Sequence, residues 1–179
     1  MKALKIIGLT LAGIIALILI TGLFVNGKYA VVREVTINKS KQEVFDYVKY
    51  LKNQRNFSVW AKIDPVMKTE FRGEDGTVGF VSAWDSENPD VGKGEQKIIG
   101  LTNGERIDYE LHFIEPFEST DFAYMSTKTV SENKTKVEWG FNGKMKYPMN
   151  LMLIFMNMEK MLAPDLENGL NNLKNILEQ

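Results

Sequence analysis

The pattern of apolar and polar positions divides the chain into two parts. Residues 6–25 are twenty consecutive positions without a charged side chain, IIGLTLAGIIALILITGLFV. As an α-helix this run would be about 30 Å long, which matches the hydrocarbon thickness of a bilayer. We therefore expect residues 1–26 to form an N-terminal transmembrane helix. We expect residues 30–179 to form a single domain that lies close to the bilayer.

A cleaved secretory signal is the alternative to an uncleaved anchor. Such a signal has a positive start, which Lys2 and Lys5 provide, but its apolar stretch is shorter and ends at a small-residue cleavage site. The residues that follow this run, Asn26–Ala30, contain no such site. A lipid-modified lipoprotein needs a cysteine, and the chain has none. The pattern therefore favours an anchor.

The side of the membrane on which the domain lies depends on the flanking charges. Lys2 and Lys5 favour a cytoplasmic N-terminus, whereas Lys28 and Arg33 on the other side favour the reverse. The second pair belongs to a domain that folds, and long domains translocate largely regardless of charge. We expect a single-pass membrane protein whose domain is extracytoplasmic.

After the apolar run, the chain has first a mixed and then an alternating pattern. Residues 30–37 read as a β-branched strand, and Ser40 with Glu43 makes a capping-box pattern that opens a short helix. Apolar residues then alternate with polar ones, which is typical of strands with one buried face. The alternating stretches are residues 67–72, 78–84, 96–98, 107–113, 122–126 and 137–145. Asn103-Gly104 is a strong hairpin signal between two of them.

The C-terminal part returns to helical spacing. Residues 148–157 are almost entirely apolar, and residues 158–177 carry leucines along one face. A sheet with one apolar face must be covered, and this long helix is the element available to cover it. We predict an α+β fold, in which a curved antiparallel sheet of about seven strands wraps round a long C-terminal helix and leaves space for a cavity between them.

The order of these elements and several local motifs resemble the START-like helix-grip superfamily (SRPBCC), in its polyketide cyclase/dehydrase branch. The matching segments are Ile37–Val48, Leu51–Asn53, Trp60, Gly92 with Gly94, Glu105–Tyr109 and Gly169–Lys174. The resemblance covers roughly residue 31 to the C-terminus. It implies a helix-grip fold and a hydrophobic ligand such as a lipid, sterol or polyketide, and some members are enzymes. Arg55 and Phe57 depart from the family pattern, which bears on the details of the cavity.

Composition narrows the chemistry. The net charge is −1, which removes the electrostatic argument for nucleic acid. With no cysteine and a single histidine, His112, the chain offers neither a nucleophilic triad nor a His/Cys metal site. The sequence has no phosphate-binding glycine loop, and we expect no cofactor and no metal.

Most aromatic side chains of the strands share one phase, which we expect to face inward. They form either a solid core or the wall of a cavity in which a few polar groups orient a ligand. The candidate cavity residues are Trp60, Phe71, Phe80, Ser82, Trp84, Ile98, Tyr109, Leu111, Phe113, Phe122, Tyr124, Trp139, Phe141, Met152 and Met156.

Met152 and Met156 belong to a methionine-rich segment. Six of the nine methionines of the chain lie between residues 145 and 161. A helix that is apolar on all sides is buried or meets a membrane, and methionine suits adaptable surfaces. This segment is therefore either core or a pliable gate at the cavity mouth.

The leading hypothesis is a membrane-anchored domain that binds a hydrophobic small molecule or lipid and has no catalytic residue. One alternative is a polyketide cyclase-like or lipid-modifying enzyme, for which tyrosines are the only acid or base candidates. Another is a structural or interaction module without a ligand.

Overall fold

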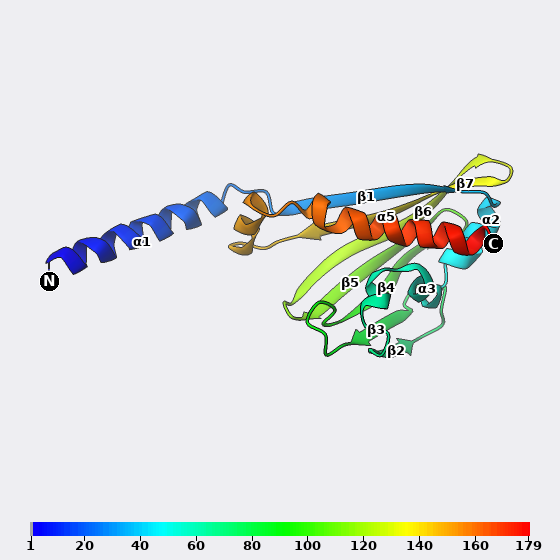
Figure 1. Cartoon of the computed structure of the whole chain (residues 1–179), viewed down its shortest axis with the longest axis horizontal. Coiled ribbons are helices and arrows are strands. Elements are labelled where there is room, and N and C mark those ends of the chain that lie inside the picture. The colour runs from blue at the N-terminus through cyan, green and yellow to red at the C-terminus, as the bar shows by residue number, and fades with distance from the viewer. Residues whose placement is uncertain (1) are drawn as a thin grey trace.

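The chain folds into an N-terminal helix that projects from a domain built on one antiparallel sheet (Figure 1). The computed structural model describes residues 2–179. The elements are α1 (Lys2–Gly22), β1 (Lys28–Ile37), α2 (Lys41–Val48), η1 (Leu51–Asn53), α3 (Gln54–Phe57), α4 (Trp60–Ile63), β2 (Lys68–Arg72), β3 (Val81–Asp85), β4 (Lys93–Thr102), β5 (Arg106–Glu115), β6 (Ser119–Ser131), β7 (Lys134–Lys144), η2 (Met149–Ile154) and α5 (Met158–Leu177).

The sheet has seven strands in the order β1-β7-β6-β5-β4-β3-β2, and all neighbours are antiparallel. Strands β2 to β7 follow one another as a meander, and β1 returns to pair with β7. The helix α5 crosses the inner face and packs mainly on β1 (Figure 1). The predicted α+β helix-grip fold, a curved sheet round a long C-terminal helix, is confirmed.

Local signals account for the short elements. The Ser40 hydroxyl accepts a hydrogen bond from the Glu43 amide at 3.4 Å, and the Glu43 carboxylate accepts one from the Ser40 amide at 3.1 Å. This is the predicted capping box of α2, which satisfies two amide groups that a helix start leaves unpaired. The Asn103-Gly104 signal lies in the turn between β4 and β5, where Gly104 has a φ of +73°.

The buried core lies between the inner face of the sheet and α2, α3 and α5. It contains no residue of α1, so the domain has a hydrophobic core of its own. The core residues are Val31, Ile37, Val44, Phe45, Val48, Leu51, Phe57, Phe80, Ile98, Ile107, Tyr109, Ala123, Met125, Val137, Trp139, Ala163, Leu166, Leu170 and Leu173.

Candidate ligand-binding site

A cavity of about 180 Å³ lies beside this core, between the inner face of the sheet and the helical segment α3–α4. Strands β3, β4 and β5 form its floor, and Leu166 of α5 lies on one side. The lining residues are Leu51, Gln54, Arg55, Ser58, Trp60, Ala61, Met67, Thr69, Ser82, Trp84, Val91, Gln96, Leu111, Phe113, Ala123, Trp139, Phe141 and Leu166.

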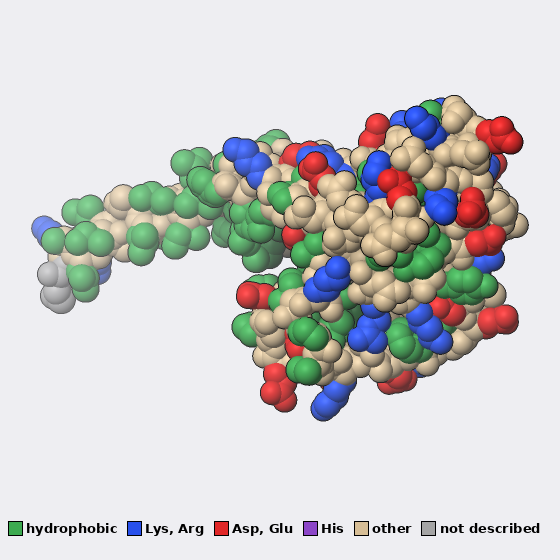
Figure 2. Space-filling model, turned by 45° about the vertical axis from the view of Figure 1, so that its right-hand side comes forward, with side chains coloured by type: hydrophobic (Ala, Val, Ile, Leu, Met, Phe, Trp, Pro, Cys, Tyr) green, Lys and Arg blue, Asp and Glu red, His purple; other side chains and the backbone are tan. Residues whose placement is uncertain are grey.

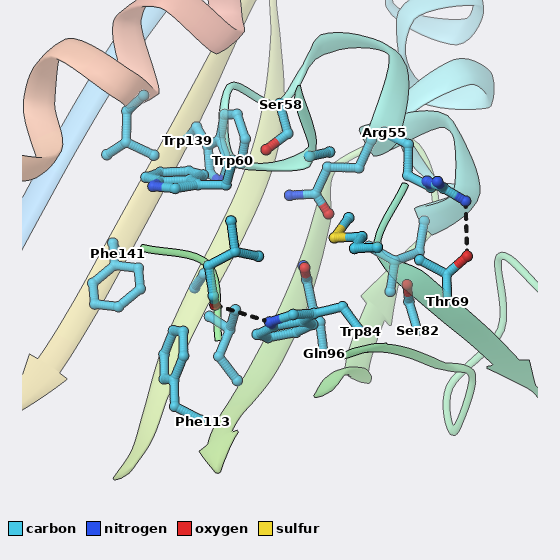
Figure 3. Close-up of a pocket in the computed structure, with 18 residues that line it drawn as sticks. Arg55, Ser58, Trp60, Thr69, Ser82, Trp84, Gln96, Phe113, Trp139 and Phe141 are labelled. Carbon is cyan, nitrogen blue, oxygen red and sulfur yellow. Dashed lines mark hydrogen bonds between the residues drawn. The ribbon is translucent and has the colours of Figure 1, made fainter. Parts of the chain in front are cut away.

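Aromatic rings form most of the wall. The Trp139 ring lies 5.8 Å from that of Trp60, edge to face, and Trp84 meets Phe113 in the same way at 5.9 Å. The Trp84 indole nitrogen donates a hydrogen bond to the Val91 carbonyl at 3.3 Å, which fixes its ring (Figure 3). All three tryptophans of the chain line the cavity. Its surface is therefore rigid and largely apolar, as in most small-ligand sites.

Small residues leave this space open. Ala123 stands between Tyr109 and Phe141 in the register of β5, β6 and β7, and its methyl group leaves room above it. A Cβ on Gly94 would come within 2.6 Å of the Trp84 ring, so glycine lets this indole lie flat on β4. The cavity is thus built by short side chains on the sheet as much as by the large ones around it.

Two polar side chains lie on the cavity floor. Ser82 and Gln96 are directly opposite each other in the β3–β4 register, and Gln96 is only 9 % exposed. Within residues 2–179 no hydrogen bond joins either side chain to another residue, and Figure 3 shows both among the residues that surround the space. Because both line the cavity, this pair is available to a polar atom inside it.

Arg55 is the one titratable side chain among the lining residues. Its guanidinium donates a hydrogen bond to the Thr69 hydroxyl at 3.0 Å, at the edge of the cavity (Figure 3). No group of three or more His, Cys, Asp or Glu residues in the described part of the chain is arranged to hold a metal ion.

The structure brings seven of the predicted site residues together on the cavity wall. They come from one helix and three strands, and the shared inward phase was the signal that identified those on the sheet. These residues are Trp60, Ser82, Trp84, Leu111, Phe113, Trp139 and Phe141.

Four other predicted residues face inward but do not line the cavity. Phe80, Ile98 and Tyr109 are at most 1 % exposed and belong to the packed core, where burial raises the pKa of the Tyr109 phenol. Phe71 stacks on Phe80 with ring centroids 6.0 Å apart. Alternation identifies the residues on the inner face of a strand. It does not show which of these residues pack under α2 and α5 and which of them line the cavity.

The prediction for β6 is wrong by one residue. Phe122 is 46 % exposed, and Tyr124 lies on the outer face, whereas Ala123 and Met125 point inward. Tyr124 covers Gly140, where a Cβ would come within 2.2 Å of its ring, and it donates a hydrogen bond to Glu138 at 2.9 Å. Both phases of this strand carry apolar residues, so the larger aromatics indicated the wrong face.

Met152 and Met156 are not among the residues that line the cavity. Met152 lies in η2, a short 3-10 helix that packs against the end of α1 rather than against the sheet floor. The sequence shows that this segment is apolar on all sides. Its position in the fold depends on the place where β7 ends, because η2 begins a few residues later.

The lining residues that the sequence analysis missed come mostly from helices and loops. Arg55 and Gln54 lie on a one-turn helix, Met67 and Val91 lie in loops, and Leu166 faces the cavity from α5. Ala123 gave no signal because a small side chain resembles ordinary core. Leu166 was part of the recognised leucine face, so its burial was predictable although its neighbours were not.

No family model and no curated protein matches this sequence. Solved structures do match its fold. Truncated norcoclaurine synthase from Thalictrum flavum aligns with a TM-score of 0.61 at 10 % identity, over 85 % of this chain and 94 % of that one. Ara h 8.0201 aligns with a TM-score of 0.53 at 11 % identity, over 84 % and 98 % of the two chains. The Aha1 dimer from Colwellia psychrerythraea gives 0.53 at 14 %, over 84 % and 96 %.

The chain has the helix-grip fold. Identities this low establish the shared architecture and leave the function of this chain open. The alignments cover about the length of the domain, and the apolar helix α1 is an N-terminal candidate for a membrane span.

Proposed function

We propose that this protein is a membrane-anchored domain that binds a small hydrophobic molecule, or the apolar part of a lipid, in the cavity beside α5. The observation that carries the proposal is an apolar space of about 180 Å³, walled by all three tryptophans, in a domain that is otherwise closely packed. Apolar space of this size is uncommon in protein interiors, which pack to crystal-like density.

The volume limits the ligand. An engineered apolar cavity of about 150 Å³ binds benzene. A cavity of about 180 Å³ therefore accommodates one ring or a short alkyl segment, and a larger lipid would have to leave part of itself outside. This size favours a small aromatic or isoprenoid-like molecule over a complete sterol.

The floor of the cavity adds a polar requirement. Ser82 and Gln96 present a hydroxyl and an amide without a partner in the described chain, and neither carries a charge. A neutral oxygen on the ligand, such as a hydroxyl or a carbonyl, would satisfy them. The ligand that fits best is an apolar molecule with one neutral oxygen at its inner end.

The lining supports binding rather than acid–base catalysis. A general acid or base must reach the reacting group, and histidine, carboxylates, lysine and tyrosine are the usual choices. Among the described lining residues the only titratable side chain is Arg55, whose guanidinium donates a hydrogen bond to Thr69.

The binding test uses the tryptophans as reporters. The domain, residues 27–179, is titrated with bromobenzene, 4-bromophenol and 4-bromobenzoate, whose bromine quenches a neighbouring indole. Saturable quenching by the first two is the expected result. Ala123→Leu should abolish it by filling the cavity, whereas Ala30→Leu on the exposed side of β1 should not. Equal quenching in both variants would show that the cavity is not the site.

Membrane attachment rests on α1. It is long and apolar enough to cross a bilayer. Its most apolar stretch has a mean hydropathy of 2.6, and the domain buries none of that stretch. A signal sequence has the same properties. Within the proposal, Lys2 and Lys5 remain in the cytoplasm and residues 30–179 form an extracytoplasmic domain.

This topology is testable because the chain has no cysteine of its own. Cysteines introduced singly at Glu132, in the β6–β7 turn, and at Lys2 are labelled in intact cells with a membrane-impermeant maleimide. Labelling at position 132 alone is expected. Labelling at position 2 alone would reverse the topology, and release of a chain that lacks α1 would identify a signal peptide.

A further inference from the structure

An exposed apolar collar surrounds the point where α1 joins the domain. Phe24 is 84 % exposed and Phe155 is 88 % exposed, although both are large aromatic side chains. The apolar surface of α1 continues onto the domain at this junction (Figure 2). The collar consists of Leu23, Phe24, Tyr147, Met149, Met152, Ile154 and Phe155, all exposed to at least a third of their surface.

The collar is held to α1 by specific contacts. The side-chain amide of Asn150, itself buried, donates hydrogen bonds to the carbonyls of Gly22 at 2.7 Å and Val25 at 2.9 Å. The Gly22 carbonyl lies at the end of α1, where a helix leaves such groups unpaired, and Val25 lies in the segment that follows. Leu151 packs against Gly22, where a Cβ would come within 3.0 Å. The collar therefore has a defined position relative to the helix axis.

A second joint lies one residue before β1. The Met145 amide donates a hydrogen bond to the Gly27 carbonyl at 2.9 Å, and a Cβ on Gly27 would come within 2.2 Å of the Met145 carbonyl. Only glycine permits this approach. The segment between α1 and β1 is thus bound to the residue that follows β7 and does not act as a free linker.

Three lysines lie directly behind the collar. Lys28 and Lys144 are opposite each other in the β1–β7 register, and Lys146 follows two residues later. All three are exposed, and within residues 2–179 none forms an ion pair. Like charges directly opposite on neighbouring strands are destabilising, so this pair is unfavourable unless an anion compensates it. The nearby Glu159 is paired with Arg33 at 2.6 Å.

We infer that the collar and these lysines form a seat for an anionic bilayer surface. The collar enters the interface between headgroups and acyl chains, and the lysines meet the lipid phosphates above it. This order, aromatic and aliphatic groups followed by lysines, is that of segments that lie in a membrane interface. Each lysine near an anionic surface strengthens attachment by roughly fivefold.

This inference rests on the proposed membrane attachment through α1, and it adds an orientation. A domain held only by α1 could swing, whereas a domain seated on its collar keeps one face toward the lipid. The partner is the anionic headgroup layer itself, because the seat combines exposed apolar side chains with unpaired lysines and continues the apolar surface of α1.

The test uses the full-length chain in lipid nanodiscs. A single cysteine at Ile154, in the collar, carries an environment-sensitive fluorophore, and the matched control carries it at Glu132, in the distal β6–β7 turn (Figure 1). Quenching by aqueous acrylamide is compared in phosphatidylcholine and in an equal mixture with phosphatidylglycerol. We expect several-fold weaker quenching at position 154 than at position 132, with the larger difference in the mixture.

Two variants separate the contributions. Exchange of Lys28, Lys144 and Lys146 for glutamine should remove the difference between the two lipid mixtures. Phe24→Ser with Phe155→Ser should raise quenching at position 154 in both. The three lysines and the two phenylalanines are exposed, so the fold, checked by circular dichroism, should be unchanged.

The outcomes distinguish this inference from the attachment on which it rests. Extraction of the chain by alkaline carbonate would overturn attachment through α1. If the chain resists extraction but positions 154 and 132 are quenched alike in both lipids, attachment stands and the seat is wrong. If the lysine variant keeps the full lipid preference, the assigned role of the lysines is wrong.

Discussion

Replacement of Gln96 by methionine should make the protein more stable and less selective. Methionine has a similar length and no polar group to satisfy. Gln96 is 9 % exposed as a residue, and it lines the cavity. A buried polar group left without any partner would cost about 1–3 kcal/mol. The cavity has room for a water molecule that would satisfy part of the amide, so we expect the lower bound, about 1 kcal/mol.

The assay combines stability with binding. A gain of about 1 kcal/mol raises the thermal midpoint of a domain of this size by about 3 °C. Selectivity is the ratio of the affinities for 4-bromophenol and bromobenzene, which share a ring and differ by one hydroxyl. Loss of a hydrogen bond of about 1.4 kcal/mol should lower this ratio about tenfold.

Two controls make this prediction refutable. Gln42→Met exchanges an exposed glutamine on α2 and should change stability by less than about 0.5 kcal/mol and leave the affinity ratio unchanged. Ser82→Ala, opposite Gln96, should lower the ratio as well. If Gln96→Met lowers the midpoint and leaves the ratio unchanged, the amide is a satisfied structural group and the polar floor has no role in recognition.

Three further predictions follow from individual contacts. Gly169→Ala should destabilise the domain by about 1–3 kcal/mol in urea denaturation and weaken bromobenzene binding, since a Cβ there would come within 2.7 Å of the Trp139 ring and push it toward the cavity. Tyr124→Phe should cost about 0.5–1.5 kcal/mol through its lost bond to Glu138 and leave binding unchanged, and weakened binding would contradict its place on the outer face. Burial raises the pKa of the Asp121 carboxyl above its ordinary 3.8, so its contribution to stability is full below that pH and is lost as the pH rises through the raised value. The stability of the wild type minus that of Asp121→Asn, measured by urea midpoints, should therefore fall as the pH rises from the acid range, and a rise would refute the direction.

The arrangement of secondary structure follows from local patterns in the sequence. Three local signals can be recognised in the sequence because each acts over only a few residues. They are the capping box of Ser40 and Glu43, the Asn103-Gly104 turn, and the alternation along β5 and β7. The number of strands followed from the strand-like stretches of the sequence, and the covering helix α5 followed from the need to bury one face of the sheet. The apolar length of α1 was equally plain.

The position of the cavity was decided by tertiary packing. Tyr109 and Leu111 share one face of β5, yet the first lies in the core and the second lines the cavity, because α5 and the segment α3–α4 cover different parts of the sheet. Ala123 could not be identified as a site residue for the same reason. A small side chain leaves an open space only where the neighbouring residues do not fill it, and those neighbours are set by the fold. The two phases of β6 were both apolar, and the sheet register decided between them.

The methionine-rich segment shows the same division between what the sequence predicts and what the fold decides. Its sequence determined that it is apolar on all sides and therefore needs an apolar neighbour. Only the fold decided that this neighbour is the end of α1 rather than the cavity, because Asn150 bonds the carbonyls of Gly22 and Val25 across 128 and 125 residues of sequence. Local patterns determine which surfaces a segment must bury, whereas contacts between distant residues determine where it buries them.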